Sequence, residues 1–185
     1  MLTEIKDDAK NRMVKAIEAF ENALRRIRTG RAHPSLLDEV MVSYYGTPTQ
    51  LKQLANVGVE DGRTITVTPW EKSLLGDVDK AIRSSNLGLN PSNNGDIIRV
   101  PLPALTEDSR RDLLKVAKGE AENAKIAVRN ARREANNDVK ELLKEKEITE
   151  DEQRRSEEDV QKLTDKFVKD VDTLLADKEK EIMTV

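Results

Sequence analysis

The sequence predicts an α+β protein in which a long three-helix bundle carries a small inserted head rich in β-strands. Three long segments repeat apolar residues at three- and four-residue steps, as amphipathic helices do. Between the first and second of these segments, residues 31–104 hold all six prolines and several short β-branched runs. Charged residues make up 36% of the chain and aromatic residues 3%, a balance typical of thin helices with narrow buried stripes.

The first predicted helix covers residues 2–29. Gly30 follows it as the expected C-cap, and Arg25, Arg26 and Arg28 favour the negative end of the helix dipole. Its expected buried stripe consists of Ile5, Ala9, Met13, Ala16, Phe20, Leu24 and Ile27.

The second predicted helix covers residues 106–146, a length of roughly 60 Å. Thr106 is its expected N-cap, and Gly119 interrupts it at a modest cost in helix propensity. Its stripe is rich in alanine, which lets neighbouring helices approach closely. The stripe consists of Leu113, Ala117, Ala121, Ala124, Val128, Ala131, Ala135, Val139 and Leu142.

The third predicted helix begins with a capping box, in which Thr149 and Glu152 satisfy each other's backbone N–H groups. Residues 144–148 form the expected turn between antiparallel helices. The almost wholly charged residues 150–159 should project into solvent or towards a partner. The expected apolar face consists of Val160, Leu163, Phe167, Val171 and Leu174.

The inserted head should contain short strands and one short helix. We expect the helix at residues 74–85, with Leu74, Val78, Ala81 and Ile82 facing inward. The residue pattern predicts turns at 46–48 and at Pro69. The expected strands are residues 40–42, 51–59, 64–68 and 97–100.

We therefore expect one domain made of residues 1–30 plus 105–185, the bundle, and an inserted head domain made of residues 31–104. Two short segments connect them. Glycine adds backbone freedom there and proline restricts φ, which favours a hinge of limited range. The predicted hinge residues are Gly30, Arg31, Ala32, Pro101, Leu102 and Pro103.

The composition argues against an enzyme. The chain has no cysteine and a single histidine, His33, which precludes a thiolate nucleophile and argues against a histidine-based triad or metal site. No phosphate-loop or dinucleotide motif occurs. We therefore expect no catalytic residue, cofactor or metal.

The N-terminal residues lack the apolar core of a signal peptide, and no run of about 18 apolar residues occurs, so a cytoplasmic location without membrane contact is expected.

Basic residues of the second helix gather on one side, although the net charge of the chain is −3. On a helical wheel, Glu122 lies among them, and Arg110 lies just outside their arc, beside the apolar stripe. Such a row fits the regularly spaced phosphates of an RNA helix. A solvated face with pairs such as Glu122 and Lys118 is the alternative. The row consists of Arg111, Lys115, Lys118, Lys125, Arg129, Arg132 and Arg133.

Three aromatic residues of the head are weaker candidates. Tyr44 and Tyr45 could stack on a base, but neighbouring strand residues more often divide between the core and the surface. Trp70 either caps the core or makes a surface contact.

Six segments, in order along the chain, resemble the bacterial ribosome recycling factor (ribosome-releasing factor) family. Any one of them is weakly specific, but six in register are highly specific. They are residues 27–32 (IRTGRA), 44–48 (YYGTP), 87–91 (LGLNP), 98–107 (IRVPLPALTE), 128–133 (VRNARR) and 159–164 (DVQKLT).

This resemblance implies an L-shaped molecule of about transfer-RNA dimensions, with a three-helix arm and a β/α/β head. It implies a monomer that binds the rRNA of the large ribosomal subunit after termination and that, with elongation factor G and GTP, separates the subunits. The family's RNA contacts carry over to Arg110, Arg129, Arg132 and Arg133, and we add Lys118 and Lys125. A helical scaffold or chaperone that binds proteins is the alternative function, and an enzyme is third.

Overall fold

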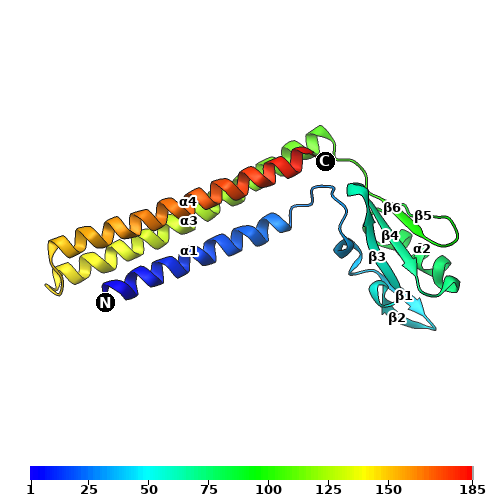
Figure 1. The fold of residues 1–185 in the computed structure, drawn as a ribbon, viewed down its shortest axis with the longest axis horizontal. Helices are drawn as coiled ribbons and strands as arrows, with labels where there is room; N and C mark the ends of the chain where they lie inside the picture. Colours follow the sequence, from blue (N-terminus) through cyan, green and yellow to red (C-terminus); the bar gives the residue numbers. More distant parts are fainter. Residues whose placement is uncertain (185) are drawn as a thin grey trace. The chain divides into compact units, whose positions relative to one another are not determined.

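The computed structural model describes residues 1–184, and the contacts among them divide the chain into two compact units. The first unit, here the arm, contains Met1–Arg28 and Glu107–Thr184. The second unit, here the head, contains Thr29–Thr106. The α+β class and the insertion of a β-rich head into a helical bundle are confirmed, and Figure 1 shows both units.

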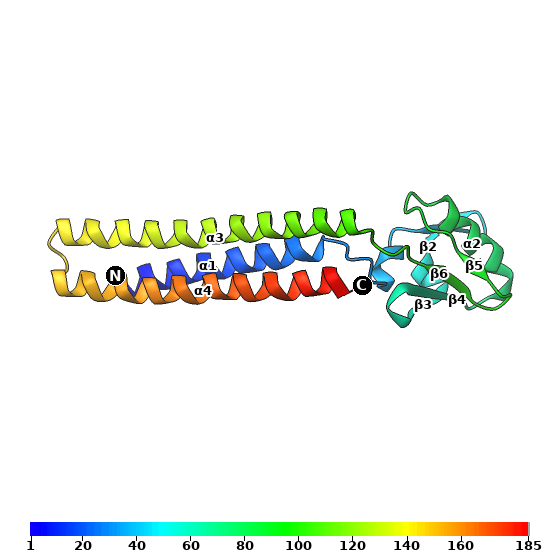
Figure 2. The ribbon, with the colours of Figure 1, turned by 90° about the horizontal axis from the view of Figure 1, so that it is seen from above.

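The arm consists of α1 (Leu2–Arg25), α3 (Glu107–Lys144) and α4 (Glu150–Thr184). Each of the three helices contacts the other two, and Figures 1 and 2 show that α3 runs antiparallel to both α1 and α4. With 38 residues, α3 extends for about 57 Å. The three predicted long helices are therefore confirmed.

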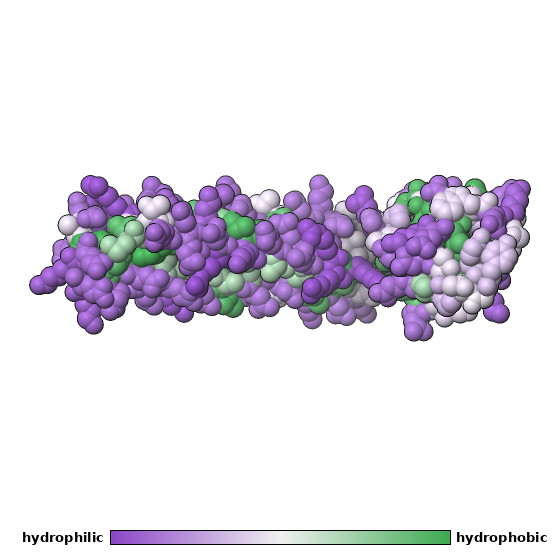
Figure 3. All heavy atoms as spheres, turned by 90° about the horizontal axis from the view of Figure 1, so that it is seen from below, coloured by the Kyte–Doolittle hydropathy of each residue, from purple (hydrophilic) through white to green (hydrophobic). Residues whose placement is uncertain are grey.

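An alanine-rich seam holds the arm together. The buried residues of α3 recur at three- and four-residue steps, as predicted, and larger side chains of α1 and α4 fill the space opposite them. Hydrophilic residues cover most of the arm on the face shown in Figure 3. The buried α3 residues are Ala117, Ala121, Ala124, Val128, Ala131, Ala135 and Val139.

The start of α4 was predicted correctly, whereas the end of α1 was not. The capping box at the start of α4 is confirmed, because the Glu152 N–H donates to Thr149 Oγ1 at 3.1 Å and the Thr149 N–H donates to Glu152 Oε1 at 3.4 Å. The predicted C-cap at Gly30 is wrong. Helix α1 ends at Arg25 with Arg26 as its C-cap, and Gly30 adopts φ +77° five residues beyond the helix.

The head contains a hairpin, a four-stranded sheet and one α-helix, α2 (Leu75–Ser84). The hairpin pairs β1 (Met41–Tyr44) with β2 (Thr47–Gln50). The sheet has the order β3-β4-β6-β5, and all its pairs are antiparallel. Its strands are β3 (Ala55–Glu60), β4 (Thr64–Pro69), β5 (Ser92–Asn93) and β6 (Ile98–Pro101). The head also contains short 3-10 helices, which are η1 (Pro34–Leu37), η2 (Leu51–Gln53), η3 (Asp61–Arg63) and η4 (Lys72–Leu74).

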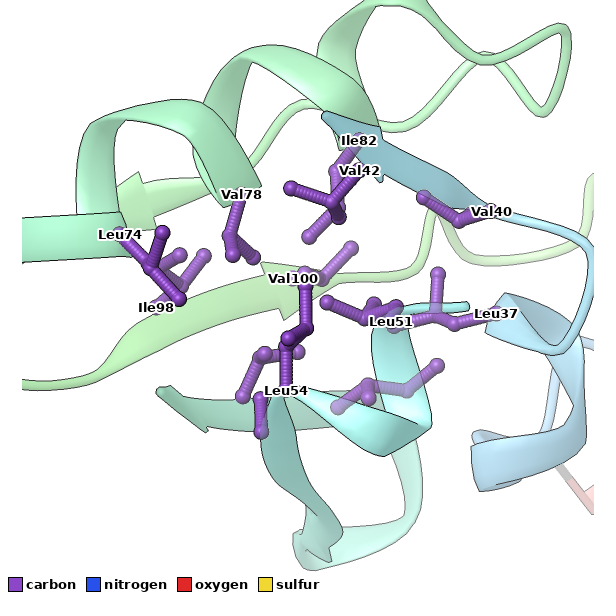
Figure 4. Close-up of a cluster of buried hydrophobic side chains, with 13 residues drawn as sticks. Leu37, Val40, Val42, Leu51, Leu54, Leu74, Val78, Ile82, Ile98 and Val100 are labelled. Carbon is purple, nitrogen blue, oxygen red and sulfur yellow. The ribbon is translucent and has the colours of Figure 1, made fainter. Parts of the chain in front are cut away.

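The head has its own hydrophobic core, between α2, the inner face of the sheet and the segment around η1 and η2 (Figure 4). In β4, Ile65 and Val67 are fully buried, while the threonines that alternate with them are half-buried. Val78 and Ile82 of α2 close the core from the other side. The head can therefore bury an apolar core without the arm.

Part of the strand prediction was wrong. Residues 51–53 form η2 rather than the start of a strand, and β2 and β5 were not predicted. Gly46-Thr47-Pro48 was interpreted only as a turn, yet Pro48 lies in β2 opposite Ser43. This position tolerates proline because β2 is one of only two strands in its hairpin, so one of its edges needs no hydrogen-bond donor.

Candidate nucleic-acid interface

The predicted RNA-binding residues all lie on α3, which presents one side to α4 and another side to solvent. Because the buried stripe of α3 faces the seam, the basic row emerges beside α4. The residues of this row differ in the ion pairs and hydrogen bonds that their side chains make within the arm.

Lys118 and Arg133 are exposed and unpaired. Within residues 1–184 neither side chain makes an ion pair or a hydrogen bond, and the same is true of Lys115. Their charges are therefore available to an external anion.

Arg129 is weakly paired. Its Nη1 lies 3.6 Å from Glu122 Oε1, and the two side chains are 45% and 60% exposed. An ion pair this exposed to water contributes little stability, so a phosphate can compete for the guanidinium. Glu122 is the predicted interruption of the basic row, and it weakens the row without removing it.

Arg132 is held in place without losing its charge. Its Nη1 donates a hydrogen bond to Gln161 Oε1 of α4 at 2.8 Å, and Gln161 Nε2 donates in turn to Asp165 Oδ1 at 2.9 Å. The amide fixes the direction of the guanidinium but carries no negative charge to neutralise it. Arg132 is therefore a pre-oriented cation at the α3–α4 boundary.

Arg110 and Lys125 have partners inside the arm. Lys125 Nζ lies 2.6 Å from Asp172 Oδ1 of α4, and its side chain is only 21% exposed. Arg110 Nη1 donates to the carbonyl oxygen of Met183 at 3.3 Å, in the last turn of α4 where the helix dipole favours a cation. Both arrangements favour a structural role, and RNA contact by these two residues stays a prediction.

The predicted hinge residues are not equally free. The Ala32 N–H donates to the Gly62 carbonyl at 2.9 Å, and the Leu102 N–H donates to the Arg63 carbonyl at 2.8 Å. Both connecting segments are thus tied to the turn between β3 and β4, and Pro101 belongs to β6. A hinge at this place stays a prediction, and these bonds would restrict it to residues nearer the arm.

Tyr44 and Tyr45 divide between the core and the surface, as the alternation of strand residues predicts. Tyr44 packs against the head core, and its hydroxyl donates to Glu71 Oε1 at 3.1 Å, a hydrogen bond that raises the pKa of the hydroxyl above its ordinary value. Tyr45 is 82% exposed at the hairpin turn, where its φ is +49°. Trp70 is 67% exposed, so it lies on the surface and does not cap the core.

The sequence interpretation missed the α4 residues that organise the row, Gln161 and Asp172. Periodicity places residues on a face of their own helix but does not say which residue of a second helix lies opposite.

Among the described residues, no cluster of three or more metal-binding side chains occurs. No described helix is both long and apolar enough to cross a membrane.

A helical bundle with exposed cations along one helix, joined to a separate β-rich head, defines a two-unit α+β protein with a candidate surface for nucleic-acid phosphates. This is the class that the fold and the site define.

Comparison with known proteins identifies the family. The family model described as ribosome recycling factor matches residues 20–183. Ribosome-recycling factors of Thioalkalivibrio sulfidiphilus and Alcanivorax borkumensis are 60% and 57% identical to this chain over the full length of both proteins. The chain therefore belongs to the ribosome recycling factor family, and the resemblance of the six sequence segments is confirmed.

Solved structures of ribosome recycling factors have a similar fold. The solution structure of a ribosome recycling factor has a TM-score of 0.70 at 41% identity and covers 100% of this chain and 98% of its own. Another match, with a TM-score of 0.60 at 43% identity and 98% coverage of both chains, is described as models for the T. thermophilus ribosome recycling factor and the E. coli elongation factor G bound to the E. coli post-termination complex.

Proposed function

We propose that this chain is a translation factor that binds the large subunit of the post-termination ribosome and, with elongation factor G and GTP, separates the subunits for reuse. Membership of the ribosome recycling factor family carries this proposal. A structural neighbour described on a post-termination complex together with elongation factor G supports the choice of partners.

The basic row of α3 is the proposed contact with rRNA. Lys118 and Arg133 offer free charges, Arg129 offers a weakly paired guanidinium and Arg132 offers a pre-oriented one. Guanidinium groups bind phosphate oxygens in a planar, two-point geometry, and each contact releases counterions from the RNA. Local charge therefore outweighs the net charge of −3 at this surface.

The arm acts as a lever in this proposal. The alanine seam packs three long helices tightly against one another, which resists bending when a partner pushes on the protein. The head is a second packed body, and the connecting segments around residues 29–31 and 103–106 provide a hinge between the two. The protein itself makes and breaks no covalent bond, works as a monomer in the cytoplasm and needs no cofactor.

Co-sedimentation with vacant large ribosomal subunits between about 50 and 200 mM salt tests this proposal, because phosphate contacts make affinity fall steeply with salt. The double variant Arg132→Gln/Arg133→Gln should bind at least about tenfold more weakly than the parent, with a shallower salt dependence. The matched control Lys162→Gln/Lys169→Gln removes two exposed charges from α4 and should bind nearly as the parent does. Equal binding by the α3 variant and the parent at low salt would contradict the proposed contact.

A further inference from the structure

The turn of the β1–β2 hairpin holds a tyrosine in a backbone conformation that suits this residue type poorly. Tyr44 pairs with Thr47, so Tyr45 and Gly46 form the whole turn, and their φ angles are +49° and +80°. A type I′ turn requires positive φ at both positions, and asparagine, aspartate or glycine usually fills the first of them. Positive φ is uncommon for a residue with a bulky side chain. Asparagine would therefore serve the turn better than tyrosine.

Packing within the head does not compensate for this strain. The Tyr45 side chain is 82% exposed, and its ring touches the Tyr44 ring in an edge contact, with the centroids 4.5 Å apart and the planes at 73°. Within residues 1–184, the Tyr45 hydroxyl makes no hydrogen bond. The strained turn thus presents an aromatic ring to solvent, and backbone strain of this kind is typical of functional sites.

A carboxylate lies beside the two rings. Glu71 accepts the hydrogen bond from the Tyr44 hydroxyl at 3.1 Å, it is exposed, and within residues 1–184 no cation pairs with it. Lys72 follows Glu71 in the chain but pairs with Asp96, with 2.9 Å between Nζ and Oδ1. Tyr44 therefore contacts Tyr45 with its ring and Glu71 with its hydroxyl, which brings the open ring and the negative charge into one site.

The charges around this site favour a cationic partner. Residues 40–51, which include the whole hairpin, carry no charge. On α2, which packs against β1, Asp79 pairs with Arg83, while Asp77 and Lys80 have opposite signs. The charged residues that flank the hairpin in sequence are Asp38, Glu39 and Lys52. The uncompensated charge is thus negative, which repels RNA phosphates and attracts a basic side chain.

We infer that Tyr45 and Glu71 form a docking site for an arginine side chain of a partner protein, an inference that rests on the proposed function because it concerns subunit splitting. A planar guanidinium group stacks on an aromatic ring and pairs with a carboxylate, so it can use both groups at once. Tyr44 positions the two. The site belongs to the head, whereas the basic row of α3 belongs to the arm, so the two can be tested separately.

The main test is Tyr45→Asn, because this change removes the ring and gives the turn a residue that it prefers. We expect a melting temperature at or above that of the parent and parental binding to vacant large subunits. Subunit splitting with elongation factor G and GTP should be about tenfold slower, because the stacking interaction is lost. Tyr45→Phe keeps the ring and should split ribosomes as the parent does.

Two further variants test the charge and the specificity of the effect. Glu71→Gln still accepts the hydrogen bond from Tyr44 but carries no charge, and we expect splitting about threefold slower than parental. Met41→Thr is the matched control, since Met41 is 49% exposed at the other end of the same hairpin, opposite Gln50. It should split as the parent does. Parental splitting by Tyr45→Asn or by Glu71→Gln would overturn the inference.

Photo-crosslinking identifies the occupant. The Tyr45→benzoylphenylalanine variant is irradiated on post-termination ribosomes with elongation factor G, and the products are mapped by nuclease digestion and mass spectrometry. We expect a crosslink to a protein segment within a few residues of an arginine. A crosslink to rRNA alone, or none, would overturn the inference. Failure of the parent to split ribosomes would contradict the proposed function itself, whereas a splitting parent with an equally active Tyr45→Asn would overturn only the docking site.

Discussion

At the scale of single residues, the cations of α3 differ mainly in what α4 places beside them. Arg132 has a neutral amide, Lys125 has a carboxylate, and Arg133 has neither. An amide orients a guanidinium and leaves its charge intact, whereas a carboxylate at 2.6 Å neutralises an ammonium group. Neighbouring residues of one basic row should therefore contribute unequally to RNA binding.

Replacing Gln161 with leucine should weaken binding to large subunits about threefold to tenfold, because Arg132 would lose the hydrogen bond that orients it. The measurement is a double-mutant cycle with Arg132→Gln in the co-sedimentation assay. We expect Gln161→Leu to have no further effect once Arg132 is gone. Full additivity of the two changes would show that Gln161 acts independently of Arg132.

Lys125→Met should affect the fold more than the binding. The change leaves Asp172 without its partner, and we expect a loss of about 1 kcal/mol in the free energy of unfolding. Affinity for large subunits should fall less than in Arg133→Met, which removes the same charge from an unpaired position. Urea unfolding and co-sedimentation of both variants check this order, and the reverse order of binding losses would restore Lys125 as a main RNA contact.

At the scale of elements, a buried carboxylate connects α2 to the chain that follows it. Asp79 is 8% exposed, and it accepts hydrogen bonds from Arg83 Nε at 2.7 Å and from Asn93 Nδ2 at 2.9 Å. Arg83 also donates to the carbonyl oxygen of Pro91 at 2.6 Å. These bonds tie β5 and the segment before it to α2, in addition to the apolar contacts that Leu87 and Leu89 of that segment make with the head core.

Asp79→Ala should therefore destabilise the head by about 2 kcal/mol, since hydrogen bonds to a charged group are lost and Arg83 is left without its carboxylate. Amide hydrogen exchange measures the head and the arm separately. We expect faster exchange in α2 and β6 and unchanged exchange in α3 and α4. Unchanged protection in α2 would show that the apolar core alone holds the helix.

At the scale of the whole molecule, the two units have separate cores and are joined by two short segments. Gly30 in the first segment adopts φ +77°, and a Cβ atom built on it would lie 3.2 Å from Leu105 Cγ in the second segment. Only glycine adopts this backbone conformation readily, and any larger residue would also require the Leu105 side chain to shift by a few tenths of an ångström. Gly30 therefore sets how the two connecting segments pass each other.

Gly30→Pro forces φ to about −65° and should change the hinge without touching either core. We expect the variant to retain more of its large-subunit binding than of its subunit-splitting activity with elongation factor G and GTP. Light scattering of 70S ribosomes and co-sedimentation measure the two properties in parallel. Equal loss of both, together with a lower melting temperature, would mean that the substitution damages the fold instead.

Much of the architecture could be predicted because helix formation depends on local periodicity. The alanine stripe of α3, the capping box at Thr149 and Glu152, and the position of the inserted head are all visible in the linear pattern. The predicted end of α1 was wrong and strand β2 was missed. Glycine and proline in a sequence indicate a turn or a helix end, but they do not show which backbone hydrogen bonds the tertiary fold supplies nearby.

The sequence by itself determined the α+β class, the family and the gathering of cations on one side of α3, since each of these depends on residues close together along the chain. Only the tertiary structure decided which of those cations are free, because Gln161, Asp172 and Met183 reach α3 from a helix formed by a later part of the chain. It also showed that Gly119 faces open space. The strength of a charge depends on its neighbours in space, and those neighbours are set by how the helices pack.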